Sequence, residues 1–210
     1  MKITLERGQD MFFSSDFHIN HKNICRGVSE WNRDGADKTR DFPNLEKMNS
    51  TIIDNINSKV GQDDWLVFTG DFSFGGHQHI PEFRQRILCK NILFILGNHD
   101  EHIKKNTNNY QALFTHVMEY CELTVVTNDY KKYNFILSHY PIASWNNLSK
   151  GWMHLHGHVH FTPDIKVGPG RMMDIGMDGN NYMPYSLSEV VSILKDRPIK
   201  SMFKFDHHQI

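Results

Sequence analysis

Five short apolar runs, each ending in a cluster of polar residues, are the feature that most limits how this chain can fold. Each run has the length and composition of a buried β-strand. The runs and their clusters are Met11–Phe13 before Ser14–His18, Trp65–Phe68 before Thr69–Asp71, Ile92–Leu96 before Gly97–Asp100, Phe135–Leu137 before Ser138–His139, and Trp152–Leu155 before His156–His160. Ligands in open α/β sheets gather beyond the carboxyl ends of strands, so clusters far apart in sequence are expected to meet in space.

Helical patterns lie between and after these runs. Apolar residues spaced for one helix face extend over residues 45–56 and, more weakly, over 80–88. A third helix is predicted to begin at Ser186, where Glu189 three residues later completes a capping box. Strands that alternate with helices in the first half predict βαβ units.

The second half of the chain favours strands. Runs over residues 122–127 and 133–137 flank the turn residues Asn128 and Asp129 and predict a hairpin, and a further run covers 171–175. The whole pattern predicts a mixed α/β or α+β architecture.

Length and composition predict one soluble domain over residues 1–210. Hydrophobic residues make up 39% and charged residues 22% of the chain, as in ordinary globular proteins. The longest apolar candidates are far shorter than the ~20 residues that cross a bilayer. Charged residues near the N-terminus (Glu6, Arg7 and Asp10) interrupt the stretch where a signal peptide would be apolar. We therefore expect a cytoplasmic protein without a membrane partner.

The charge balance argues against a nucleic-acid-binding module. The chain has 23 basic and 24 acidic residues, so a broad basic surface is not expected, and neither is a stable nucleic-acid partner. A phosphate-bearing substrate stays compatible with this balance, because bound metal ions can supply positive charge. The three cysteines are far apart and form no CxxC pair, which favours reduced, partly buried thiols over a disulfide framework or a zinc knuckle.

The polar clusters contain the side chains that a metal centre needs. They supply two carboxylates, one amide oxygen and four imidazoles, namely Asp16, His18, Asp71, Asn98, His139, His158 and His160. Seven ligands cannot surround one tetrahedral ion, but they fit two ions if Asp71 bridges them. Oxygen and nitrogen ligands without thiolate suit manganese, iron, zinc or nickel better than calcium or magnesium.

Spacing supports the same interpretation. The pairs Asp16-x-His18 and His158-x-His160 are expected to direct both side chains to one side of an extended segment. A glycine precedes several of the ligands (Gly70, Gly97 and Gly157), where the backbone can approach an ion closely.

The ordered set of motifs resembles the signature of the calcineurin-like metallophosphoesterase superfamily. The set is Asp16-x-His18, Gly70-Asp71, Gly97-Asn98-His99-Asp100, His139 and Gly157-His158-x-His160, and it spans about two thirds of the chain. Residues 16–24 and 138–142 are also similar to a small subgroup of bacterial and phage phosphoesterases.

The resemblance implies a four-layer αββα sandwich with two mixed β-sheets and a dinuclear metal site, with manganese favoured. One ion would be held by Asp16, His18, Asp71 and His160, and the other by Asp71, Asn98, His139 and His158. Both ions would share a hydroxide that attacks phosphorus. The catalytic residues besides Asp71 would be His99, which protonates the leaving group, and Asp100, a candidate partner that orients His99.

The chain departs from part of the superfamily pattern. Phe74 and Gly75 stand where phosphoprotein phosphatases have an Asp-Arg pair, which argues against that activity. The group that would hold the phosphate is therefore open, with candidates His21, Lys22, Arg26, Lys150 and Arg171.

Other residues in or near the motifs are interpreted as structural. His154 and His156 are assigned to a strand face or the substrate pocket rather than to ligation. Trp145 and Trp152 are assigned to core packing, and stacking on a base stays open as the alternative. The remaining histidines are assigned to the surface or the core: His77, His79, His102, His116, His207 and His208.

The expected activity is hydrolysis of a phosphomonoester or phosphodiester. A nucleotide or a nucleic-acid end is the favoured substrate, because so short a chain leaves little room for a domain that would cover the site. Two alternatives stay open: a mononuclear non-haem iron oxygenase with a two-His-one-carboxylate triad, and a non-catalytic binding protein on a degenerate phosphoesterase scaffold.

Overall fold

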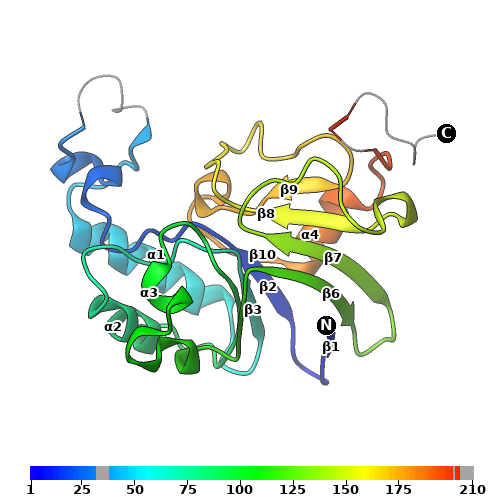
Figure 1. Cartoon of the computed structure of the whole chain (residues 1–210), viewed down its shortest axis with the longest axis horizontal. Coiled ribbons are helices and arrows are strands. Elements are labelled where there is room, and N and C mark those ends of the chain that lie inside the picture. The colour runs from blue at the N-terminus through cyan, green and yellow to red at the C-terminus, as the bar shows by residue number, and fades with distance from the viewer. Residues whose placement is uncertain (32–37, 201, 204–210) are drawn as a thin grey trace.

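The computed structural model describes residues 1–31, 38–200 and 202–203, and two five-stranded sheets form its centre (Figure 1). The first sheet has the order β10-β2-β3-β4-β5. Its strands are β2 (Met11–Ser14), β3 (Trp65–Phe68), β4 (Asn91–Ile95), β5 (His116–Met118) and β10 (Tyr185–Ser186). All neighbours in this sheet are parallel except the edge strand β10.

The second sheet has the order β1-β6-β7-β8-β9. Its strands are β1 (Lys2–Thr4), β6 (Tyr120–Val126), β7 (Lys132–Ser138), β8 (Met153–His156) and β9 (Met172–Asp174). The hairpin predicted across Asn128 and Asp129 is confirmed, since β6 pairs with β7 in an antiparallel register that places Leu123 opposite Phe135. The other pairs in this sheet are parallel.

Alternate residues of the strands form the apolar cluster between the two sheets. Phe13, Val67 and Leu93 of the first sheet pack in one cluster with Phe135 and Leu155 of the second. Side chains alternate between the two faces of a strand, so the neighbours of these residues point to the outer faces. The sheets therefore form the sandwich that the motif set implies, and this part of the prediction is confirmed.

Helices cover the outer face of the first sheet (Figure 1). Phe12, Leu66 and Phe94 pack there against α1 (Leu45–Lys59) and α2 (His79–Arg86). The helix predicted over 45–56 is confirmed, and Asn44 caps α1 by accepting a hydrogen bond from the Lys47 amide. The helix predicted over 80–88 is confirmed as far as Arg86, where α2 ends, and Leu88 beyond it is exposed. The short α3 (Glu101–Lys104) lies on the same side.

A thinner layer covers the outer face of the second sheet. Ile136 and Met172 pack there against Trp145 and Leu148, which belong to the segment that carries the 3₁₀ helix η5 (Leu148–Lys150). The predicted role of Trp145 in the core is confirmed. His154 and His156 of β8 are buried under the same cover.

Helix α4 (Leu187–Leu194) packs into the cluster between the two sheets through Leu187, Val190 and Leu194. Its N-terminus has the predicted capping box between Ser186 and Glu189. None of the helices in the described part of the chain combines the length and the apolar composition that a bilayer crossing requires.

Candidate metal centre

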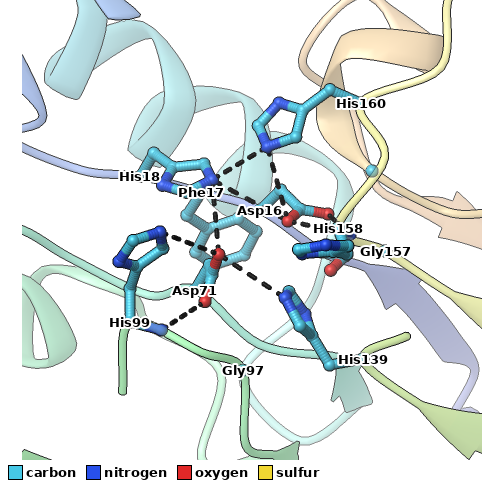
Figure 2. A network of polar contacts seen from close by, with 12 residues as sticks. Asp16, Phe17, His18, Asp71, Gly97, His99, His139, Gly157, His158 and His160 are labelled. Carbon is cyan, nitrogen blue, oxygen red and sulfur yellow. Dashed lines mark hydrogen bonds and ion pairs between the residues drawn. The ribbon is translucent and has the colours of Figure 1, made fainter. Parts of the chain in front are cut away.

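The predicted ligands come together where strands of both sheets end (Figure 2). Since β2, β3 and β4 are parallel neighbours, the residues that follow them (Asp16, Asp71 and Asn98) share one sheet edge. Strands β7 and β8 are also parallel and deliver His139 and His158 from the second sheet. The amide of His158 donates to both carboxylate oxygens of Asp16, at 3.1 and 3.0 Å, so the two sheets are joined at the centre.

Asp16, His18 and His160 form one group of ligand atoms. Nε2 of His160 lies 3.6 Å and Nε2 of His18 lies 3.8 Å from Oδ1 of Asp16. The two Nε2 atoms are 2.9 Å apart. Two donor atoms bound to one ion at about 2.1 Å in tetrahedral geometry lie about 3.4 Å apart. These separations therefore suit side chains that share a cation.

Asp71 connects this group to a second one. Its Oδ2 lies 3.6 Å from Nε2 of His18 and 3.5 Å from Nε2 of His139. The amide oxygen of Asn98 lies 2.8 Å from Nε2 of His139 and 3.0 Å from Nδ1 of His158. All seven predicted ligands are thus neighbours, with Asp71 in the bridging position between the two groups.

The protonation of the imidazoles supports a cation among them. Nδ1 of His139 donates to the carbonyl of Thr69 at 2.7 Å, and Nδ1 of His160 donates to Asp178 at 2.8 Å. In the neutral form of each ring Nε2 is then unprotonated and directs a lone pair at carboxylate oxygens, which also carry lone pairs. A divalent cation would satisfy these facing lone pairs, so the residues fit the metal centre that the motifs imply.

Burial sets the ionisation of the group. Burial raises the pKa of Asp16 from 3.8 to about 7, and it also raises the pKa of Asp71. Burial also lowers the pKa of His139 to about 4 and that of His18 well below its usual value. His18 and His139 are therefore neutral near pH 7, as ligands must be. Burial acts to lower the pKa of His160 as well, but the carboxylates of Asp178 and Asp16 raise it overall. The buried carboxylates gain most from a bound positive charge.

The backbone at the ligands differs from the prediction. Asp16, His18, His158 and His160 all have positive φ, between 48° and 73°, so neither D-x-H nor H-x-H is an extended segment. In each motif two left-handed residues turn their side chains toward the centre, and alternation along a strand is the wrong explanation.

Close approach accounts for two glycines. A Cβ on Gly157 would lie 2.3 Å from Oδ2 of Asp16, and one on Gly97 would lie 2.3 Å from Oδ1 of Asp71. Neither position has room for a side chain. Gly70 differs in having a φ of 103°, which favours glycine by conformation.

His99 lies at the rim of the centre, with 45% of its side chain exposed. Its Nε2 is 3.9 Å from Oδ2 of Asp71, and its amide donates to Oδ1 of Asp71 at 2.9 Å. The ring is thus close to the metal ligands (Figure 2) and open to solvent, where it could exchange a proton with a bound molecule.

Asp100 does not orient His99 as predicted. Its carboxylate accepts hydrogen bonds from the amides of Asp71, Phe72 and Gly97, at 2.8 to 3.0 Å, instead of from the His99 ring. Asp100 therefore holds the turns after β3 and β4 together, and its effect on the centre passes through the position of Asp71.

Three of the five candidates for a phosphate clamp have other partners. Lys22 pairs with Glu30, and Arg26 contacts Thr39 and Asp41. Arg171 donates to the carbonyls of Gly151 and Arg197. Lys150 lies in the 3₁₀ helix η5. His21 is the candidate nearest the centre, with its ring 5.5 Å from that of His18 and 3.9 Å from that of Phe74.

The other histidines predicted to be structural have contacts of that kind where the structure describes them. His77 contacts the hydroxyl of Tyr110, His79 contacts Glu82, and His116 stacks on Trp65. His102 packs against His77. His207 and His208 lie outside the described residues.

Two functional candidates, Arg40 and Asp178, are absent from the sequence prediction. The guanidinium of Arg40 is buried and donates to both oxygens of Asp178, which also accepts from His160. Burial acts to raise the pKa of Asp178, but the charge of Arg40 and the hydrogen bonds lower it overall. The sequence held a signal for Asp178, since this residue lies in the polar stretch that follows the strand predicted over 171–175; Arg40 has no such signal.

The two mixed sheets form a sandwich, and its Asp/His groups could hold a divalent metal centre. This combination is typical of a metal-dependent phosphoesterase. The family model of the calcineurin-like phosphoesterases matches residues 12–200, so the chain belongs to this family. An uncharacterized protein of Methanocaldococcus jannaschii is 30% identical over 191 residues, which cover 88% of this chain and 91% of the relative.

A solved structure supports the fold. The crystal structure of a protein of unknown function from Aquifex aeolicus matches with a TM-score of 0.62 at 19% identity. The match covers 89% of this chain and all of the Aquifex chain.

Proposed function

We propose that this protein hydrolyses a phosphomonoester or phosphodiester at a dinuclear centre formed by the two ligand groups, with a nucleotide or a nucleic-acid end as the favoured substrate. The observation that carries the proposal is the position of Asp71, whose Oδ2 lies within 3.6 Å of both His18 and His139. When bound, two divalent cations, manganese first among the candidates, would polarise the phosphoryl group and supply hydroxide at neutral pH by lowering the pKa of water.

The chain's own residues divide the remaining work. Buried carboxylates form the floor of the centre, and the exposed rings of His99 and His158 lie at its rim, so a phosphate can enter from the His99 side. His99 is the proposed general acid, which passes a proton from its ring to the departing oxygen.

Space for the organic part of an ester lies on both sides of the His99 turn. A cavity of about 180 Å³ is lined by Phe74, His99 and His102. Another of about 290 Å³ is lined by Asn98, His139 and Tyr140. Both cavities adjoin proposed site residues, which supports a substrate with a group beyond the phosphate.

The test is hydrolysis by protein that has been stripped of metal and reloaded with Mn²⁺. A p-nitrophenyl monoester, the corresponding diester, nucleotides and oligonucleotides are offered in parallel, with Asp71→Asn as the inactive control. His99→Ala should keep the cations and lose about 10²- to 10⁴-fold in kcat on substrates with poor leaving groups. The absence of Mn²⁺-dependent hydrolysis of every ester would refute the proposal. Loss of cation binding in His99→Ala would refute the role given to His99.

The two other functions considered from the sequence are tested by the same preparation. An iron oxygenase with a single triad needs one metal ion per chain, so two ions by elemental analysis would exclude it. A degenerate binding protein would bind esters without hydrolysing them, and the rate of hydrolysis would then be the same for wild type and Asp71→Asn.

A further inference from the structure

A buried arginine lies directly behind one ligand group. Arg40 has a relative exposure of only 2%, although cations are among the side chains least often buried. Its guanidinium donates to the main-chain carbonyls of Asp16 at 2.6 Å and Phe17 at 2.7 Å. These carbonyls belong to the segment that turns through left-handed conformations at Asp16 and His18. Arg40 thus fixes the backbone that carries two predicted ligands.

The same guanidinium reaches a third ligand through Asp178. Nε and one terminal nitrogen of Arg40 donate to the two oxygens of Asp178, each at 2.8 Å. Oδ2 of Asp178 in turn accepts from Nδ1 of His160 at 2.8 Å. A carboxylate on one ring nitrogen keeps the proton there and leaves the other nitrogen free to bind a metal. Asp178 therefore sets both the tautomer and the direction of His160.

We propose that Arg40 and Asp178 are a positioning pair for one cation site only, the site formed by Asp16, His18 and His160. The inference rests on the metal centre of the proposed function and adds to it an unequal dependence of the two cations on this pair.

The second group is held by different contacts. His139 is oriented by the carbonyl of Thr69 at 2.7 Å. The turn that carries Asp71 is held by the carboxylate of Asp100, at 2.8 Å from the Asp71 amide. Neither contact involves Arg40 or Asp178, so loss of the pair should leave His139 and Asp71 in place.

Charge explains why the two residues occur together. Nη2 of Arg40 lies within hydrogen-bond distance of the Asp16 carbonyl, so its positive charge is close to a site meant for cations. Asp178 cancels that charge and adds a negative group beside His160, and burial of either charge without the other would be strongly unfavourable. The pair can therefore orient three ligands without repelling the ion that they bind.

The experiment titrates metal-free protein with Mn²⁺ by calorimetry. Wild type should bind two ions. Asp178→Asn and Arg40→Lys should each weaken one ion about 10- to 100-fold and leave the other near its wild-type affinity. Arg84→Lys is the matched control, because Arg84 also donates to several main-chain carbonyls, those of Leu113, Ile87 and Cys89, but belongs to α2 rather than to the contacts of the centre. It should bind both ions normally.

Circular dichroism of the metal-free variants separates loss of the site from loss of the fold. If Asp178→Asn unfolds because Arg40 is left without a counter-charge, Arg40→Met with Asp178→Asn removes both charges and restores a neutral interior. This folded double variant should still bind one ion weakly.

Three results would overturn the inference. Wild-type affinity for both ions in a folded variant would remove any positioning role, and equal weakening of both ions would remove the selectivity for one site. A wild-type protein that binds no Mn²⁺ would refute the proposed function and this inference with it. A protein that binds two ions and hydrolyses esters, but whose variants bind as wild type does, would refute only the inference.

Discussion

Replacing Asp16 by asparagine should stabilise the metal-free protein while it destroys the site. The carboxylate is fully buried, and burial raises its pKa from 3.8 to about 7. The folded chain then holds a proton that the unfolded chain releases, so the contribution of Asp16 to stability falls as the pH rises between about 4 and 7. The raised pKa of Asp16 lowers the free energy of unfolding by about 4 kcal/mol at pH 8 and by about 2 kcal/mol at pH 5.

Asparagine removes this cost with little change of shape. Its amide oxygen can accept the hydrogen bond from the His158 amide that Asp16 now accepts at 3.0 Å. Asparagine also tolerates the φ of 57° at this position better than most residues. The free energy of unfolding should therefore rise by up to about 4 kcal/mol at pH 8, or about 8–16 °C in Tm, and by less at pH 5.

The assay is urea unfolding in the presence of chelator, followed by circular dichroism at pH 5 and pH 8. Comparison of wild type with the variant at each pH cancels the titration of the buried histidines, which both proteins share. Asp178→Asn is the contrast, because Arg40 lowers the pKa of Asp178 and its loss should destabilise the protein at pH 8. If Asp16→Asn is less stable than wild type at pH 8, the carboxylate serves the fold and the reasoning fails.

Three further predictions concern the cations. Chelation should lower the Tm of wild type by roughly 10–20 °C, since two sites at 100 times their Kd contribute about 2.7 kcal/mol each; an unchanged melting curve would argue against a metal bound by the fold. Gly157→Ala should abolish Mn²⁺ binding in calorimetry, because its Cβ would lie 1.9 Å from Oγ of Ser15, whereas Gly61→Ala, which meets only the side chain of Asp64 at 2.9 Å, should bind normally. Mn²⁺ affinity should rise by about tenfold per pH unit from pH 5 to 7, because Asp16 must lose a proton with a pKa of about 7; an affinity independent of pH would contradict that protonation state.

Local sequence patterns predict the helices and strands whose structure depends mainly on their own residues. The capping box at Ser186 and the apolar face of 45–56 specify helices from within, and the structure has both. The strands β1 and β5 were not predicted, because each has three residues and exists only through pairing with β6 or β4. Strand formation of this kind depends on the neighbouring strand more than on the segment itself.

The environment of the centre was less accessible from the sequence than its ligands. Ligands are recognisable by type and by their place after apolar runs, so the seven candidates could be named together. Arg40 lies in a segment with no periodic pattern, and its partners Asp16 and Asp178 are 24 and 138 positions away. Contacts at such distances follow from the closed sandwich, which a local pattern does not contain.

The spacing of Asp16 and His18 has a physical cause in the residue between them. Phe17 is buried, with its ring 4.1 Å from that of Phe68 and 6.1 Å from that of Phe72. This apolar anchor holds the middle of the motif in the core, while the left-handed residues on either side turn toward the centre. The strain of that backbone is offset by hydrogen bonds from the Asp16 amide to Gly70 and from the His18 amide to Asp71. The spacing D-x-H therefore joins the metal centre to the apolar core, and a polar residue in place of Phe17 should loosen both.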